Sequence, residues 1–174
     1  MNKTKDIQRL FAKYLVESGR EFLCENFSHT LAEMDICLLS KSNLIHEFEV
    51  KISRSDFLAD KKKRKWSYYQ QAFIDWKLPG QEFYVRKCPN YFFYVCPNRL
   101  IGIDEIPSYA GLYWVDDDGS ITLKKKAKKL HYYTCDVEVI KKMLRYHTER
   151  KYIGACRVTV LNRANQNNFE KIEE

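Results

Sequence analysis

The chain has 174 residues, of which 45% are hydrophobic, 14% aromatic and 30% charged. A chain of this length buries about 70% of its unfolded surface, and 12 Tyr, 10 Phe and 3 Trp supply core anchors, which argues against a disordered protein. No run of about 18 apolar residues exists to span a membrane, and the polar start MNKTKDIQRL contains no signal-peptide apolar region. We therefore expect one cytoplasmic domain over residues 1–174, with its six cysteines reduced.

The first half of the chain combines helical and strand-like patterns. Apolar residues at three- and four-residue spacing predict a helix over residues 4–18. Alternating patterns predict three strands, over residues 21–27, 33–39 and 44–52. Ser53, followed three residues later by Asp56, predicts the start of a long helix that runs to about Trp76. Asp56 and Asp60 are expected to cap this helix or to pair with neighbouring arginines.

The second half is richer in strands. Three more strands are predicted, over residues 90–96, 112–115 and 120–123. The last two form a hairpin around Asp116 to Gly119, which we interpret as an Asp-Gly turn because a calcium loop would need an acidic residue where Ala127 stands. A helix is predicted over residues 136–150 and a frayed tail over 165–174, so the region from about 135 onward is an appendage to the domain.

Two acidic residues are expected to face each other across the hairpin of the second and third strands. Successive side chains of a strand point to opposite faces, so Glu47, Glu49 and Lys51 share one face of the third strand. The tightest hairpin that keeps the apolar faces together has a three-residue turn at 41–43. This register places Asp35 directly opposite Glu49, with Cβ atoms about 5 Å apart.

The facing carboxylates of Asp35 and Glu49 form a candidate metal site, because two carboxylates so close repel each other unless a cation lies between them. Oxygen ligation by these two side chains and the carbonyl of Val50 suits Mg²⁺ or Mn²⁺. Lys51, on the same face, could hold an attacking water or stabilise charge on a phosphoryl oxygen. Glu17 is either the solvent-facing end of the first helix's inward stripe or a third ligand. The alternative is an ordinary solvated strand face.

The positive residues behind the net charge of +7 gather in three stretches with aromatic residues between them: two lysine-rich runs, at 61–65 and 124–129, and a third, more dispersed group at 141–151. This pattern favours a phosphate-backbone partner over the alternative of merely solvated faces. The predicted nucleic-acid-binding residues are Arg54, Lys61, Lys62, Lys63, Arg64, Lys65, Lys124, Lys125 and Lys126.

The order helix, strand, Asp-bearing strand, E-x-K strand and helix resembles that of the PD-(D/E)XK nuclease superfamily. Within it, the stretch from Glu49 to Asp60, EVKISRSDFLAD, is similar to the signature of MmcB-like DNA repair proteins and their phage relatives. The segments 90–97 (NYFFYVCP) and 106–112 (IPSYAGL) are also similar to that family. The resemblance spans roughly residues 34–130 and leaves the flanking helices outside it.

The resemblance implies an α/β fold with a restriction-endonuclease-like core, in which helices flank a central mixed β-sheet. It also implies that Asp35 and Glu49 are metal ligands and that Lys51 is the catalytic lysine. Met34 stands before Asp35, where the superfamily's name motif has proline, which is a common departure. The resemblance leaves the role of Glu17 open, because no sharp motif surrounds it.

These observations together predict a Mg²⁺- or Mn²⁺-dependent phosphodiesterase that hydrolyses DNA, in DNA repair or phage DNA metabolism. No nucleotide cofactor is expected, since none of the six glycines lies in a phosphate-binding loop motif. Two alternatives stay open: a catalytically silent nucleic-acid-binding module of the same fold, and an RNA-processing nuclease.

Overall fold

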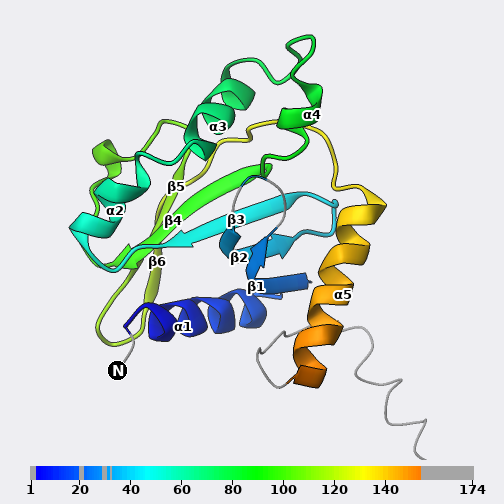
Figure 1. Cartoon of the computed structure of the whole chain (residues 1–174). Coiled ribbons are helices and arrows are strands. Elements are labelled where there is room, and N and C mark those ends of the chain that lie inside the picture. The colour runs from blue at the N-terminus through cyan, green and yellow to red at the C-terminus, as the bar shows by residue number, and fades with distance from the viewer. Residues whose placement is uncertain (1–2, 20–21, 29–30, 32, 154–174) are drawn as a thin grey trace, which may run out of the picture.

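The computed structural model describes residues 3–19, 22–28, 31 and 33–153. Its elements are α1 (Lys3–Glu17), β1 (Phe22–Ser28), β2 (Glu33–Leu39), β3 (Ile45–Val50), α2 (Arg54–Asp60), α3 (Lys65–Ile74), α4 (Glu82–Val85), β4 (Tyr91–Pro97), η1 (Ile103–Glu105), β5 (Gly111–Val115), β6 (Ile121–Lys125) and α5 (Val137–Ile153). The strands form one six-stranded sheet in the order β1 to β6 (Figure 1). The β3–β4 and β4–β5 pairs are parallel and the other pairs antiparallel, so the fold is α/β with a mixed sheet.

All six strands predicted from the sequence are present, with ends shifted by no more than two residues. The helices predicted over residues 4–18 and 136–150 correspond to α1 and α5. The short helices α4 and η1 have no counterpart in the prediction, since segments of three or four residues carry no periodic signal. The predicted tail over residues 165–174 lies outside the described residues.

The prediction of one long helix from Ser53 to about Trp76 is wrong. The structure has two helices there, α2 and α3, separated by a turn at residues 61–64. Ser53 does begin α2, since its side chain accepts a hydrogen bond from the backbone N–H of Asp56 at 3.2 Å. Five consecutive cations in one helix would repel each other at i,i+3 and i,i+4 spacing. The turn instead lets Lys65 point toward the sheet while Lys61 stays exposed.

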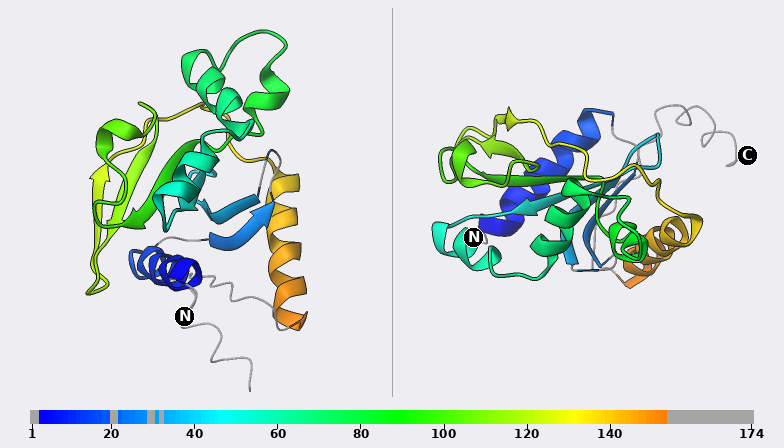
Figure 2. Two further views of the ribbon diagram at one scale, coloured as in Figure 1. Left: turned by 60° about the vertical axis from the view of Figure 1, so that its left-hand side comes forward. Right: turned by 90° about the horizontal axis from the view of Figure 1, so that it is seen from above.

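Helices cover both faces of the sheet (Figure 2). On one face, Phe11 and Leu15 of α1 are buried in a cluster with apolar residues of β2, β3, β4 and β5. On the other face, Tyr69 of α3 packs against Phe92 of β4, and Met143 of α5 packs over β1 and β2. The second face therefore has two separate apolar clusters, one with α3 and β4 and the other with α5, β1 and β2. The polar face of β3 lies between them.

Two smaller predictions are confirmed. Asp116 donates its backbone N–H to the carbonyl of Ser120 at 2.9 Å, and Gly119 adopts a φ of +86°, as an Asp-Gly turn between β5 and β6 requires. Every cysteine within the described ranges is a free thiol, and all but Cys135 are buried; Cys156 falls outside those ranges. None of the described helices combines the length and the apolar character needed to cross a bilayer.

Candidate active site

The β2–β3 hairpin has the register that the sequence predicted. Ile36 pairs with Phe48, and the N–H of Ser40 donates to the carbonyl of Leu44 across the turn at 2.9 Å. One step beyond Ile36 and Phe48, the same register places Asp35 opposite Glu49. The carboxylate of Asp35 there accepts a hydrogen bond from the backbone N–H of Val50 at 2.7 Å, which holds Asp35 against β3.

A network of charged side chains surrounds this point, on the face of the sheet covered by α2 and α3. We call it the acid–lysine cluster. It contains five carboxylates and three ammonium groups, from Asp35, Glu47, Glu49, Asp56, Asp60, Lys51, Lys63 and Lys65. Glu47, Glu49, Lys51, Asp60 and Lys65 are all less than 5% exposed, which is unusual for charged residues and is tolerated because they pair with one another.

Glu49 lies at the centre of the cluster. Its Oε1 accepts hydrogen bonds from the ammonium groups of Lys51 at 2.9 Å and Lys63 at 3.2 Å, and its Oε2 from Lys65 at 2.9 Å. Lys65 reaches from the first turn of α3 and also donates to Glu47 at 3.0 Å. The hydroxyl of Tyr69 donates to the other oxygen of Glu47 at 2.6 Å, so α3 is tied to β3 through both glutamates.

Lys51 extends past the end of β3 and bridges the strand to α2. Besides Glu49, its ammonium group lies 3.2 Å from Asp60 Oδ1 and 3.6 Å from Asp56 Oδ1. The predicted pairing of these aspartates with neighbouring arginines is therefore corrected: Asp56 and Asp60 lie one helical turn apart, face the sheet and pair with Lys51. Lys63 also contacts Asp60, at 2.6 Å.

The carboxylates of the cluster differ in the direction in which their pKa values are shifted. Burial, and then the charge of Glu49, raise the pKa of Asp35 to about 6. Burial alone would also raise the pKa of Glu49, but Lys65 and Lys51 outweigh it and hold this pKa at about 2. Burial raises the pKa of Glu47 despite its contact with Lys65. Burial would lower the pKa of Lys51, yet Glu49 outweighs it and keeps the pKa of this lysine above its usual range, so Lys51 is a cation at neutral pH.

The donor set of the hairpin fits Mg²⁺ or Mn²⁺ in kind. The hairpin register places Asp35 opposite Glu49, the charge of Glu49 adds to burial in raising the pKa of Asp35, and the carbonyl of Val50 is in the adjoining peptide. Magnesium in enzymes is often held by only one or two carboxylates together with water and substrate phosphates. Among the described residues no group of three or more His, Cys, Asp or Glu side chains is arranged to hold a metal ion.

Glu17 does not belong to this site. It lies at the exposed end of α1 and pairs with Lys13 at 3.6 Å. Because α1 covers the face of the sheet opposite to Glu49, the prediction of Glu17 as a metal ligand is corrected in favour of its alternative, the end of the helix meeting solvent.

The first basic run is divided between surface and interior. Lys61, Lys62 and Arg64 are exposed, and Lys63 is half exposed. Lys65 is only 3% exposed, so its predicted role at a nucleic-acid-binding surface is corrected: Glu47 and Glu49 hold it beneath α3. The sequence contained no signal that separates this lysine from the other cations of the run.

The other predicted basic residues are at the surface, with different partners. The guanidinium group of Arg54 is held by both carboxylate oxygens of Glu105, at 2.5 and 2.6 Å. It could bind a DNA phosphate only after this ion pair with Glu105 breaks. In the second run, Lys124 lies 4.7 Å from the ring centre of Trp114, and Lys125 donates to the carbonyl of Pro107 at 2.9 Å. Lys126 is exposed.

Comparison with known proteins yields a likeness in fold. A solved structure, the SPO1766 protein of unknown function from Silicibacter pomeroyi, superposes with a TM-score of 0.59 at 18% sequence identity, covering 100% of this chain and 99% of the other. No family model matches the sequence. No curated protein matches it either.

The replacement of Lys65 by methionine should destabilise the protein by about 3–5 kcal/mol, because Glu47 and Glu49 would remain buried without their shared cation. Urea denaturation measures the loss. Arg64→Met, an adjacent exposed position, should change stability by no more than about 0.5 kcal/mol. Equal stabilities of the two variants would contradict the buried bridge.

The replacement of Asp35 by asparagine should stabilise the metal-free protein at neutral pH. The pKa of Asp35 is about 6 in the folded protein against an ordinary 3.8, so the folded state holds the proton more tightly than the unfolded state. Ionisation of Asp35 therefore costs stability as pH rises from about 4 to about 6, and asparagine removes that cost, which is about 1–3 kcal/mol.

Urea titrations of both proteins in EDTA, repeated between pH 4 and 7, measure this difference. It should be small at pH 4, grow toward pH 6 and then stay constant, while Asp117→Asn in the exposed β5–β6 turn shows no such growth. A difference that is independent of pH would show that Asp35 ionises as an ordinary surface acid does.

Proposed function

We propose that the protein is a metal-dependent nuclease that hydrolyses phosphodiester bonds of DNA. One observation carries the proposal: the β2–β3 register, continued by one position from the Ile36–Phe48 pair, places Asp35 opposite Glu49, whose charge acts on it, and the ammonium group of Lys51 lies 2.9 Å from Glu49. Two oxygen ligands for a divalent cation beside a permanently charged lysine form a set that suits attack of water on a phosphodiester.

The topology supports the proposal. The antiparallel β1–β2–β3 unit is followed by a helical crossover to β4, which pairs with β3 in parallel. The order of α1, β1, the Asp-bearing β2, the E-x-K strand β3 and α2 is the one that resembles the PD-(D/E)XK superfamily, and a restriction-endonuclease-like core is part of the proposal. Glu49 and Lys51 lie where β3 ends and the crossover begins, at an edge of the sheet where side chains from β2, β3 and α2 converge.

Lys51 acts in this reaction as a cation and hydrogen-bond donor. Its raised pKa keeps it protonated at neutral pH, which makes it unsuitable as the base that takes a proton from water. As the water oxygen loses a proton to solvent and bonds to phosphorus, the bond to one sugar oxygen breaks, that oxygen takes a proton from solvent, and negative charge grows on the non-bridging oxygens of the phosphate. The ammonium group of Lys51 stabilises that charge, and its contacts with Glu49 and Asp60 hold it in position beforehand.

Asp35 and Glu49 hold the metal in this proposal, with the carbonyl of Val50 as a further donor. Asp35 is fixed for this by the hydrogen bond from Val50 N–H, and Glu49 by its three lysine partners. A bound Mg²⁺ or Mn²⁺ supplies Lewis acidity toward the phosphate and a water of lowered pKa.

The exposed cations of the two basic runs bind the DNA backbone. Lys61, Lys62 and Arg64 lie in the turn that joins α2 to α3, directly after Asp60 of the acid–lysine cluster, and Lys124 and Lys126 lie at β6 and just beyond it. Contacts of this kind position a strand without reading its sequence. A role in DNA repair or phage DNA metabolism follows from the family resemblance.

A catalytically silent nucleic-acid-binding module is the second candidate, and one observation favours it. Both carboxylate oxygens of Glu49 are already bonded to lysine ammonium groups, so the charge of Glu49 itself is balanced without a metal. A silent module would bind nucleic acid equally well after removal of divalent metal and would cut none. An RNA-processing nuclease is distinguished by offering single-stranded RNA and DNA side by side.

Cleavage should require both the metal and Lys51. With a panel of labelled duplex, single-stranded, flap and junction DNA, EDTA should abolish cleavage and Mg²⁺ or Mn²⁺ should restore it. Lys51→Met should lower the cleavage rate about 100- to 1,000-fold, because the charge that develops on the phosphate loses its stabilising partner.

Lys5→Met is the control for this variant, since Lys5 is exposed on α1, which covers the other face of the sheet, and it should retain the parental activity. Thermal scans of both variants establish that they fold. A Lys51→Met protein that is folded and cuts at the parental rate would reduce the E-x-K pattern to a structural ion pair.

DNA binding should weaken steeply with salt. If the exposed cations of the two runs neutralise about five phosphates, log K should fall with log salt at a slope of about −4 to −5 for a duplex. Lys61→Ala with Lys62→Ala should reduce the steepness by about 2, measured by fluorescence anisotropy at several salt concentrations. The double variant Lys5→Ala with Lys13→Ala removes the same charge from exposed positions of α1, which covers the face of the sheet opposite to α2 and α3. It should leave the slope as in the parent protein. Equal slopes for both double variants would mean that the first run is only a solvated surface.

A further inference from the structure

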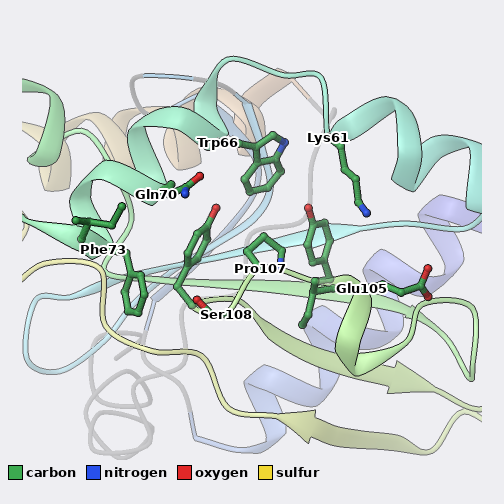
Figure 3. Close-up of a pocket in the computed structure, with 11 residues that line it drawn as sticks. Lys61, Trp66, Gln70, Phe73, Glu105, Pro107 and Ser108 are labelled. Carbon is green, nitrogen blue, oxygen red and sulfur yellow. The ribbon is translucent and has the colours of Figure 1, made fainter.

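A pocket of about 490 Å³ lies beside the acid–lysine cluster, between α3 and the connection from β4 to β5 (Figure 3). The residues labelled along its walls in Figure 3 are Trp66, Gln70 and Phe73 of α3, Glu105, Pro107 and Ser108 of the connection, and Lys61 of the α2–α3 turn. The volume falls within the range of small-molecule sites. Nothing in the mechanism proposed above uses this pocket.

Aromatic rings form much of the pocket lining. Trp66 and Tyr94 have ring centres 5.8 Å apart, and Phe73 and Tyr109 have ring centres 5.6 Å apart. Tyr94 and Tyr109 are almost completely buried, and Trp66 is anchored by a hydrogen bond from its indole N–H to the carbonyl of Asp60. These contacts hold the rings in place before any ligand arrives, and flat apolar faces of this kind suit a planar aromatic ring.

The rim of the pocket is positively charged and draws on both basic runs. Lys61 lines it directly, Lys128 lies 5.6 Å from the ring centre of Phe73, and Lys125 donates to the carbonyl of Pro107. Burial lowers the pKa of Lys125, and the nearby charge of Lys128 lowers it further. The acid on this rim, Glu105, is neutralised by its two contacts with Arg54. A ligand that combines an aromatic ring with negative charge therefore fits best.

The pocket also offers hydrogen-bonding groups and a direct connection to the proposed catalytic centre. Gln70 provides an amide donor and acceptor at the wall, and Ser108 provides a hydroxyl. Tyr94 is the neighbour of Glu49 in the β3–β4 register, and its hydroxyl donates to Asp60, the partner of Lys51, at 3.4 Å. The aromatic wall and the acid–lysine cluster thus share a side chain.

We propose that this pocket binds one unstacked nucleobase of a DNA strand and thereby determines which phosphodiester lies at Lys51. Base stacking on the partly exposed rings of Trp66 and Phe73, which the buried tyrosines support from behind, supplies affinity; the lysine rim binds the flanking phosphates, and Gln70 and Ser108 contact the edge of the base. The inference rests on the proposed function, since it names the part of the substrate that the site recognises: an unpaired or flipped nucleotide next to the cut.

An abasic scan tests the inference without cleavage. A fluorescein-labelled single strand of about 12 nucleotides is bound in EDTA at low salt, and its bases are removed one at a time. Removal at one position should weaken binding about 10-fold or more, and removal elsewhere much less, because one stacked base contributes about 1–3 kcal/mol. Ser108→Phe, which places a ring in the pocket, should weaken binding of the intact strand by the same factor and leave binding of the critical abasic strand unchanged.

Ser42→Phe in the exposed β2–β3 turn is the control and should leave the whole pattern as in the parent protein. If Ser108→Phe fails to fold, Gln70→Trp fills the same pocket from an exposed position on α3. Two outcomes would overturn the base pocket even where the protein cuts DNA. In one, the strand binds but removal of any single base has the same effect; in the other, the critical position is still found with the variant whose pocket is filled. A clear critical position with no cleavage under any metal would keep the pocket and overturn hydrolysis, and absence of binding would overturn both.

Discussion

The bridge that Lys65 makes between Glu47 and Glu49 is the interaction on which the rest of the site depends. It places a cation within 3.0 Å of both glutamates beneath α3, where neither carboxylate could remain charged alone. Because Lys65 begins α3, the bridge also explains why the chain turns at residues 61–64 instead of continuing one helix. The position of α3 over the sheet, and with it one wall of the aromatic pocket, follows from that bridge.

The same cluster separates charges in a way that suits a site for nucleic acid. Its carboxylates point inward around Glu49 and outnumber the three lysines that face them, whereas the exposed cations lie on the surrounding turn and on β6. A divalent cation complements the interior and a phosphate backbone complements the exterior. Tyr94 lines the pocket and donates its hydroxyl to Asp60 of the cluster, so the proposed base site lies one side chain away from the partner of Lys51.

Local patterns in the sequence were sufficient for much of this structure. Alternation of apolar and polar residues predicted the six strands and the register that brings Asp35 opposite Glu49, because a one-residue slip would expose the whole apolar face of β2. The same alternation placed Glu47 and Glu49 on one face. The i,i+4 spacing of Asp56 and Asp60 indicated a shared helix face but not its partner, since the arginines next to them in the sequence are as plausible as a lysine on another element.

The sequence by itself therefore determined the strands, the E-x-K face and the presence of two basic runs, since each depends on neighbours within a few residues. Only the tertiary structure decided which cation of the first run is buried, that Glu17 is on the wrong side of the sheet, and that Trp66, Phe73, Tyr94 and Tyr109 surround one pocket. Those outcomes depend on how α1 and α3 pack across the sheet. Chemically similar lysines become a buried bridge or a solvated surface according to the carboxylates that packing brings to them from distant parts of the chain.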